Sequence, residues 1–406
     1  MLPNLDIKLC DYKQRSDGVV LLTLGRSTRA IRNQSPFEAI IAINREGEIS
    51  WHREFDFCLM DCRRSGQNTL LIMGTGGRAM EIGFDGKLLN QWYCKERFPK
   101  GQVGIALDTM KIHHGLCELT DGKIASISIK QHKLQEPAEN WNYFMADTVV
   151  EFDRRGNITS EFSLADVLDI NRFAHGSEAP YWEMQGWPKT KDWSHANCII
   201  EDPKDGGLLV SLRHQDAIIK VTRDGELAWI LGDPTGWEGK YKEKLLDIIG
   251  GRPFYHQHDL SFTSNGDLML FDNGTAGAFP PKALQPIEER ESFVLSYDIN
   301  QINMTATETW RYGGADLPYS HYVSGVCEMP NGNKFIACTG ICHDLDGKRV
   351  EVPPQGVGII ELIEVTPRGD RTFHATISDP DAGLDAGWSG FRPEYLSSDV
   401  ELGELV

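Results

Sequence analysis

One stretch of the chain concentrates polar side chains at the open end of an expected hairpin. The stretch DWSHANCIIEDPKDGGLLVSLRHQD has two apolar runs around a Pro/Asp/Gly turn, a pattern typical of a β-hairpin. His195 and Asn197 precede or begin the first run, and Arg213 and His214 follow the second. Because the turn falls near residues 203–206, His195 and Arg213 are nearly equidistant from it and should lie side by side across the antiparallel pair.

These residue types suit chemistry on an anionic group. Arg213 carries a permanent cation whose planar fork fits pairs of anionic oxygens. A neutral imidazole is a good nucleophile near pH 7, because its free pKa is about 6.5, and a second imidazole can move a proton. Asn197 and His195 can donate hydrogen bonds to oxygens on which charge develops.

Two kinds of hairpin alternate along the chain and indicate its fold. AIIKVTRDGELAWILG represents one kind, and QHDLSFTSNGDLMLFDN represents the other, whose residues are smaller and more apolar. Six of each kind, in pairs repeated about every 70 residues, predict an all-β protein, a six-bladed β-propeller with its active site at the central channel. The alternative fold is an irregular β-sandwich, but such a fold gives no reason for two kinds of hairpin to alternate strictly, so the alternation favours the propeller. We expect one domain over residues 1–406, with repeats from about residue 16 to 375 and a C-terminal tail over about 376–406.

The register of the smaller hairpins places polar groups at one level of the channel. His114, His258 and Ser324 each lie eight residues before a turn glycine, and Asn197 lies nine before its own. If these hairpins form the inner strands, all four side chains point toward the axis. The same strand face carries, two residues earlier, Ile112, His195, His256 and Tyr322. A lone histidine in a strand usually has a structural role, so the prediction of a site depends on the register that these residues share. The register places no carboxylate at this level of the channel.

Two long inserts lead into inner strands and should overhang the channel. HGSEAPYWEMQGWPKTKDW precedes His195, and GDPTGWEGKYKEKLLDIIGGRPFYHQH leads to His258. Their aromatic residues offer an apolar lip, although packing onto the blades would account for at least half of them. The predicted substrate-binding residues are Ser324, His256, Tyr322, Trp193 and Tyr255.

Composition excludes several classes of partner. The net charge of -18 argues against nucleic acid and against an anionic membrane surface. No basic segment followed by an apolar one opens the chain, and no run of about 18 apolar residues could span a membrane. The nine cysteines are irregularly spaced and form no zinc pattern. These features predict a cytoplasmic protein in a reducing compartment; the sequence leaves an oligomer open.

The segments around these histidines resemble the bacterial arylsulfate sulfotransferases (ASST). The resemblance rests on DWSHANCIIEDPKDGGLLVSLRHQD, YHQHDLSFTSNGDLMLFDNG and HHGLCELTDG, and covers most of the chain. It implies a six-bladed propeller that transfers a sulfuryl group from a phenolic sulfate ester to a phenol without a cofactor. By the same resemblance, His258 matches the histidine that becomes sulfated. The supporting residues match His195, Asn197, Arg213 and His114, with His113 adjoining His114, and Ser324 falls where the family has a channel threonine.

Two other readings of the channel are compatible with the sequence. Three channel histidines could bind a divalent metal ion in a hydrolase or lyase, although Arg213 would weaken such a site. A propeller that only binds a partner on its rim would need no polar cluster at the channel. We rank sulfuryl transfer first, with no metal, and with an aromatic sulfate donor and a phenolic acceptor as partners.

Overall fold

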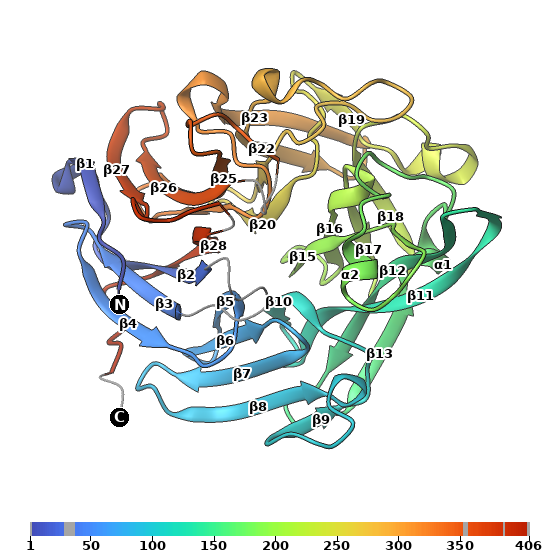
Figure 1. Ribbon diagram of the computed structural model, residues 1–406, viewed down its shortest axis with the longest axis horizontal. Helices are drawn as coiled ribbons and strands as arrows, with labels where there is room; N and C mark the ends of the chain where they lie inside the picture. The colour runs from blue at the N-terminus through green and yellow to red at the C-terminus, as the bar shows by residue number, and fades with distance from the viewer. Residues whose placement is uncertain (1, 28–36, 352–355, 385, 404–406) are drawn as a thin grey trace.

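The chain folds into a ring of β-sheets around a central axis (Figure 1). The computed structural model describes residues 2–27, 37–351, 356–384 and 386–403. Its two α-helices are single turns, α1 (Leu164–Val167) and α2 (Tyr181–Met184). The 3-10 turns are η1 (Tyr12–Gln14), η2 (Lys95–Arg97), η3 (Arg213–Gln215), η4 (Gly239–Lys244), η5 (Ile287–Glu289) and η6 (Gly314–Asp316).

Successive groups of four antiparallel strands make up the ring. The first groups are β5 (Leu59–Ser65), β6 (Thr69–Gly74), β7 (Arg78–Gly83) and β8 (Leu88–Cys94), then β10 (His113–Glu118), β11 (Ile124–Ala138), β12 (Trp141–Phe152) and β13 (Ile158–Ser163). Next come β15 (Ala196–Glu201), β16 (Leu208–Leu212), β17 (Ala217–Val221) and β18 (Leu227–Gly232), then β20 (His258–Phe262), β21 (Leu268–Asp272), β22 (Phe293–Asn300) and β23 (Thr305–Gly313). The short strands β9 (Ile105–Leu107), β14 (Thr190–Asp192) and β19 (Asp247–Ile249) add to the outer parts of these sheets in parallel.

Both ends of the chain join the last sheet and close the ring. It contains β24 (Gly325–Glu328), β25 (Lys334–His343), β26 (Val357–Val365) and β27 (Arg371–Ile377), with β1 (Asp6–Cys10) paired to β27. It also contains β28 (Ala386–Leu396), β2 (Val19–Ser27), β3 (Phe37–Asn44) and β4 (Ile49–Glu54). Closure of this kind joins the first and last units of the ring, while each sheet keeps an outer edge strand such as β4, β13 or β18.

The predicted all-β propeller class is confirmed, and the two hairpin kinds form as expected. QHDLSFTSNGDLMLFDN gives β20 and β21, and its turn residue Gly266 has φ +87°, which glycine adopts without strain. AIIKVTRDGELAWILG gives β17 and β18. Strands β5, β10, β15, β20, β24 and β28 line the axis, each in contact with the next. The count of six blades stays a prediction, because β26 and β28 also pair and merge two units into one nine-stranded sheet.

The predicted tail differs from the structure. Residues 386–396 form β28, an inner strand that pairs with β2 at the other end of the chain. A search for hairpins could not find β28, because it has no hairpin partner beside it in the sequence. Asp385 and residues 404–406 of the predicted tail lie outside the described residues. Within the described part of the chain, no helix is long and apolar enough to cross a membrane.

Apolar side chains fill the space between neighbouring sheets. Leu71, Met73 and Trp92 of one sheet pack against Val150 and Phe152 of the next, all at most 1% exposed. Side chains of a strand point alternately toward the two neighbouring sheets, and both faces of β6, β16 and β21 are buried along their whole length. Burial on this scale holds the sheets at fixed positions around the axis.

A buried arginine ties the inner strands together at the axis. Arg392 of β28 is 2% exposed, and its guanidinium bonds both carboxylate oxygens of Asp61 on β5, at 2.8 and 2.9 Å. The same group reaches Asp259 Oδ1 on β20 at 3.2 Å, the carbonyl of His114 on β10 at 2.6 Å and Cys198 Sγ on β15 at 2.8 Å. One side chain therefore contacts the inner strands of four other units.

The remaining inner strand joins this network through Asp259. Asp259 Oδ2 accepts a hydrogen bond from the backbone N–H of Val326 on β24 at 3.0 Å, and its Oδ1 receives one from Arg63 at 2.7 Å. A Cβ atom at Gly325 would lie 2.5 Å from both Asp259 Oδ2 and Arg392 Cβ. Glycine is therefore required for the close approach of β24 to the arginine.

We expect Arg392→Met to destabilise the protein by about 3–5 kcal/mol, because it leaves the carboxylates of Asp61 and Asp259 buried with one partner fewer. Urea unfolding followed by tryptophan fluorescence measures the change. Arg368→Met is the control, since Arg368 is exposed and its side chain has no partner within the described chain. Equal stability of the two variants would contradict the role of the network.

Candidate active site

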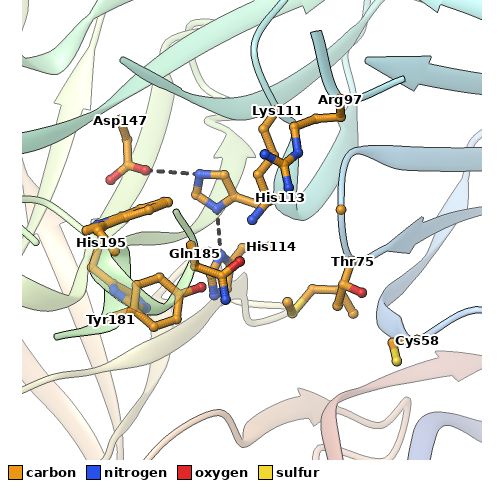
Figure 2. A pocket seen from close by; sticks show the side chains of 13 residues that line it. Cys58, Thr75, Arg97, Lys111, His113, His114, Asp147, Tyr181, Gln185 and His195 are labelled. Atoms are coloured by element: carbon orange, nitrogen blue, oxygen red, sulfur yellow. Dashed lines mark hydrogen bonds and ion pairs between the residues drawn. The ribbon is translucent and has the colours of Figure 1, made fainter. Parts of the chain in front are cut away.

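A pocket of about 400 Å³ lies where the first residues of β10, the approach to β15 and part of β5 meet (Figure 2). Its lining comes from several units of the ring and from the insert that carries α2. The lining residues are Cys58, Met60, Thr75, Gly76, Arg97, Lys111, His113, His114, Asp147, Tyr181, Trp182, Gln185 and His195. The pocket is large enough for a small aromatic molecule.

His114 and His195 meet in this pocket, as the register predicted. Their ring centroids are 5.5 Å apart. His113 lines the pocket as well, and its Nδ1 lies 2.6 Å from Nδ1 of His114, so both histidines face it. Nε2 of His113 contacts Asp147 Oδ1 at 3.0 Å, at an angle too bent for a good hydrogen bond. Burial lowers the pKa of His114 well below its usual value, and the neighbouring histidines lower it further.

A carboxylate that the strand register did not reveal orients His195. Asp192 Oδ2 lies 2.5 Å from His195 Nδ1, and Asp192 Oδ1 accepts a hydrogen bond from Trp182 Nε1 at 2.9 Å. Burial alone would raise the pKa of Asp192, but His195, His214 and these hydrogen bonds hold it well below its usual value. An ionised Asp192 fixes the proton of His195 on Nδ1 and leaves Nε2 for the pocket.

Arg213 lies beside His195, as the count across the hairpin predicted. The backbone N–H of Arg213 donates to the carbonyl of His195 at 3.1 Å. Its guanidinium contacts Nε2 of His214, whose Nδ1 donates to the carbonyl of Asp192 at 2.9 Å. Burial lowers the pKa of Arg213, while Asp192 and Asp216 raise it, so the guanidinium keeps its charge near pH 7.

His258 is buried and has a fixed tautomer. Asn273, which follows β21, donates from Nδ2 to the carbonyls of Ser320 and Val323 at 2.8 and 3.1 Å. Its Oδ1 must therefore be the acceptor at the 2.7 Å contact with His258 Nδ1. The proton of His258 is on Nδ1, and Nε2 keeps its lone pair, with no hydrogen-bond partner among the described residues. Burial lowers the pKa of His258 well below its usual value, and the charge of Arg213 lowers it further, so the ring is neutral.

His256 differs from His258 in that its Nε2 forms a hydrogen bond, while its buried Nδ1 has no hydrogen-bond partner among the described residues. Its Nε2 lies 3.0 Å from the carbonyl of His175, and its Nδ1 lies 3.1 Å from Asp216 Oδ1. The backbone N–H of His256 also donates to Asp216 Oδ1 at 2.7 Å. His256 therefore anchors the loop before β20, with Nε2 bound to a carbonyl and Nδ1 buried against the carboxylate of Asp216.

Asn197 spans two inner strands. Its Nδ2 donates to the carbonyl of Gln257 at 2.7 Å, and its Oδ1 is buried without a hydrogen-bond partner in the described residues. The amide thus holds β15 against the residue that precedes His258. Asn197, Arg213 and His258 do not line the pocket itself, whereas His114 and His195 do.

None of the five residues predicted to bind a substrate lines the pocket, and His256, described above, is one of them. The hydroxyl of Ser324 forms a hydrogen bond with that of Ser320 at 2.7 Å. The same Oγ of Ser324 accepts a hydrogen bond from the backbone N–H of Thr339 at 3.0 Å. Tyr322 packs its ring 6.0 Å from that of His321.

Two aromatic residues of the predicted lip, Trp193 and Tyr255, are buried. Trp193 donates from Nε1 to the carbonyl of Arg172 at 3.0 Å, and the hydroxyl of Tyr255 donates to Asp233 at 2.9 Å. Their polar atoms have partners within the protein, which is the usual condition for burying such rings. The aromatic wall comes from Tyr181 and Trp182 on α2, which belong to the same insert that was expected to form the lip.

Among the described residues, Asp192, His195 and His214 form a group that could hold a metal ion, with candidate ligand atoms within 4.8 Å of one another. It contains two histidines and a carboxylate, where the sequence suggested three channel histidines. Asp192 already bonds both histidines, and an ion would have to displace the proton on His195 Nδ1. The cation of Arg213 beside His214 also opposes a metal ion.

Comparison with known proteins identifies the class of this chain. The arylsulfotransferase (ASST) family matches residues 16–380, so the chain belongs to this family, as the sequence resemblance predicted. It is 27% identical over 245 residues to the arylsulfate sulfotransferase AssT of Escherichia coli O6:H1, a match that covers 49% of this chain and 40% of the relative. The AssT of Lelliottia amnigena is 24% identical over 268 residues, which cover 56% of this chain and 43% of that one.

The chain thus spans less than half of the length of the relatives that it matches. A crystal structure of a protein of unknown function from Bacteroides caccae is similar with a TM-score of 0.49 and 14% identity, and covers 93% of this chain and 99% of that one.

The neutral, buried state of His258 predicts a pH dependence of stability. The folded-state pKa lies below the unfolded value of about 6.5, so the unfolded chain takes up a proton first as the pH falls. His258 therefore does not lower the free energy of unfolding above about pH 6.5, and it lowers this free energy progressively as the pH falls below that value. Between pH 7 and pH 5 the wild type should lose about 2 kcal/mol relative to His258→Gln.

Urea unfolding of both proteins at pH 5, 6 and 7 measures this difference. The comparison cancels groups that titrate in the opposite sense, such as Asp216, whose pKa is raised by burial to about 7. Parallel stability profiles for the two proteins would show that His258 takes up a proton as readily in the folded state as in the unfolded state.

Proposed function

We propose that the protein is an arylsulfate sulfotransferase that moves a sulfuryl group from a phenolic sulfate ester to a phenolic acceptor through a sulfohistidine at His258. The observation that carries the proposal is the neutral imidazole of His258, with Nδ1 held by Asn273 and Nε2 free, close enough to Arg213 for its charge to lower the pKa of the ring. Family membership supports the same reaction class. The mechanism uses no metal ion or cofactor.

In the first half-reaction, the lone pair of His258 Nε2 attacks the sulfur of the donor. The N–S bond forms as the bond between sulfur and the phenolic oxygen breaks, and that oxygen leaves with the electron pair. Asn273 Oδ1 accepts the Nδ1 hydrogen of His258 throughout and stabilises the positive charge that grows on the ring. Arg213 offers its cation to the sulfate oxygens.

His195 supplies the proton for the leaving oxygen. When His195 is protonated on both nitrogens, Asp192 holds the Nδ1 hydrogen and stabilises the imidazolium, and Nε2 can donate to the phenolate. In the second half-reaction, Nε2 of His195 removes the proton of the acceptor phenol. The phenolic oxygen then attacks the sulfur, the N–S bond breaks, and His258 regains its lone pair.

The alternative nucleophile, His256, is less suitable. Its Nε2 faces the carbonyl of His175, and its Nδ1 faces Asp216, so an attack would require both contacts to change. A metal-dependent hydrolase centred on Asp192, His195 and His214 is also weaker, because these groups already satisfy one another by hydrogen bonds.

Protein quenched after mixing with 4-nitrophenyl sulfate and no acceptor should carry a sulfuryl adduct on the peptide that contains His258. Covalent transfer also predicts ping-pong kinetics. His258→Ala should abolish turnover, while His256→Gln, which keeps a donor toward the His175 carbonyl, should retain a measurable fraction. Mass spectrometry of the quenched protein is the measurement. Consumption of the donor without an adduct, and kinetics that require both substrates bound together, would establish direct transfer.

Replacing Arg213 by Met should lower kcat by about 10²-fold or more with the same donor, because the developing charge on the sulfate oxygens loses a permanent cation. Initial rates with phenol as acceptor measure the effect. Arg223→Met, in the β17–β18 turn, is the control, since Arg223 pairs with Glu151 and lies outside the pocket lining. A similar loss in both variants would point to a general loss of structure.

A further inference from the structure

We propose that the pocket selects aromatic substrates that carry a carboxylate on the ring, and that Lys111 and Arg97 bind this second anionic group. The inference rests on the proposed function and names its substrate class. It arises from two cations on the pocket lining that have no role in the sulfuryl-transfer steps.

Lys111 is a buried cation without an anionic partner. The residue is 8% exposed, yet its ammonium has no ion pair and no hydrogen-bond acceptor within the described residues. The Nζ atom of Lys111 lies over the face of the Trp182 ring, 5.8 Å from the ring centre. Burial, together with the charge of Arg97, lowers the pKa of Lys111 to about 8. A buried ammonium in this state would gain from an anion in the pocket.

Arg97 places a second cation beside Lys111. Figure 2 shows the two charged ends close together on one side of the pocket. The guanidinium of Arg97 lies over the Trp187 ring at 5.4 Å and forms no ion pair within the described chain. Arg97 is exposed whereas Lys111 is buried, and neither forms an ion pair within the described chain. A planar carboxylate suits the fork of an arginine together with the point charge of a lysine.

The carboxylate of the lining lies away from these cations. Asp147 contacts His113 with Oδ1, and its Oδ2 accepts hydrogen bonds from Ser194 Oγ and Ala196 N at 2.5 and 2.6 Å. Figure 2 shows Asp147 on the side of His113 opposite to Arg97. Asp147 is therefore committed to the protein and leaves the cationic side of the pocket open to a ligand.

The aromatic wall gives the substrate ring a place between the two charged regions. Tyr181 lies 5.5 Å from the ring of His195, and the rings of Tyr181 and Trp182 pack edge to face at 5.0 Å. Trp182 contacts Lys111 as well. A substrate ring on this wall can direct its sulfate ester toward His195 and its carboxylate toward Lys111.

These cations are not the ones that would hold the transferred sulfuryl group. Lys111 precedes β10 and Arg97 lies in η2, whereas His258 and Arg213 belong to the units of β20 and β15. Arg213 lowers the pKa of His258, while the pKa of Lys111 responds to Arg97. Two separate cationic regions therefore suit a substrate with two separate anionic groups.

The test compares two acceptors with 4-nitrophenyl sulfate as donor: 4-hydroxybenzoate, which has the carboxylate, and phenol, which lacks it. We expect the wild type to have a kcat/KM about 10-fold to 100-fold higher for 4-hydroxybenzoate, as for one charged hydrogen-bonded contact. In Lys111→Met and Arg97→Gln the ratio of the two kcat/KM values should fall toward one. Lys87→Met, an exposed lysine between β7 and β8, is the matched control and should keep the ratio.

A binding measurement separates this inference from the proposed function. Calorimetry with benzoate, which cannot accept a sulfuryl group, should show binding that weakens about 10-fold or more in Lys111→Met and is kept in Lys87→Met. If benzoate binds in this way but no aryl sulfate is turned over, the proposed function fails and the carboxylate site stands.

Two results would overturn the inference while the proposed function stands. One is turnover without a preference for 4-hydroxybenzoate, together with no binding of benzoate. The other is an equal loss of kcat/KM for both acceptors in Lys111→Met, which would assign the cations to the sulfate ester itself.

Discussion

The guanidinium of Arg392 at the axis is the contact on which the geometry of the ring depends. A buried ion pair adds little net stability over a well-packed apolar group, because desolvation opposes the attraction. Here the ion pair fixes the relative positions of the inner strands. The planar fork bonds Asp61 with two parallel hydrogen bonds and also reaches Asp259, so the strands that carry these residues must begin at matching heights. Strands that slipped by one residue would turn these carboxylates away from the axis.

The same contact reaches the candidate active site through neighbouring residues. Arg392 bonds the carbonyl of His114, and Asp259 directly follows His258 in the chain. Phe391, the residue before Arg392, has its ring 6.4 Å from that of His114 and 6.1 Å from that of His258. Both histidines thus pack against a side chain of a strand that belongs to a different unit of the ring. Their separation follows from closure of the fold and from no local feature of either hairpin.

Irregular strand starts set where the histidines point. The pairing shifts between His113 and Leu116 and again between His258 and Leu260, and both shifts contain a residue with positive φ, His114 at 60° and Asp259 at 56°. Bulges of this kind turn a side chain away from its regular direction. Backbone strain of this type persists only where the surroundings enforce it, and the contacts of Arg392 supply that enforcement.

Sequence reasoning predicted the features that repeat and missed the features that depend on a distant partner. The turn count placed His195 next to Arg213, since an antiparallel hairpin fixes that distance locally. The same count across the β20–β21 hairpin would have brought Asn273 near His258, a signal that was present in the sequence. The contact between Asp192 and His195 could not be found in this way. Asp192 precedes the strand, and the path of the insert before the strand brings its carboxylate to His195.

The aromatic residues show why composition alone was insufficient. Trp193 and Tyr181 lie in the same insert, yet the first is fully buried and the second lines the pocket. Whether an aromatic ring faces a ligand or the core depends on where its polar atom finds a partner, and Trp193 finds one in the carbonyl of Arg172. The unpaired state of Lys111 is likewise a property of the folded pocket and has no trace in the sequence.

The position of β28 in the chain has a consequence for how the protein is made. Every other strand of the ring precedes β28 in the order of synthesis, so Arg392 and Phe391 leave the ribosome after all the histidines of the site. Until β28 docks between β2 and β26, Asp61 and Asp259 face an unfilled axis, and His114 and His258 lack the Phe391 ring against which both pack. The candidate active site is therefore completed only when the last strand docks and closes the ring, and a chain stopped before residue 386 would carry these histidines without the contacts that position them.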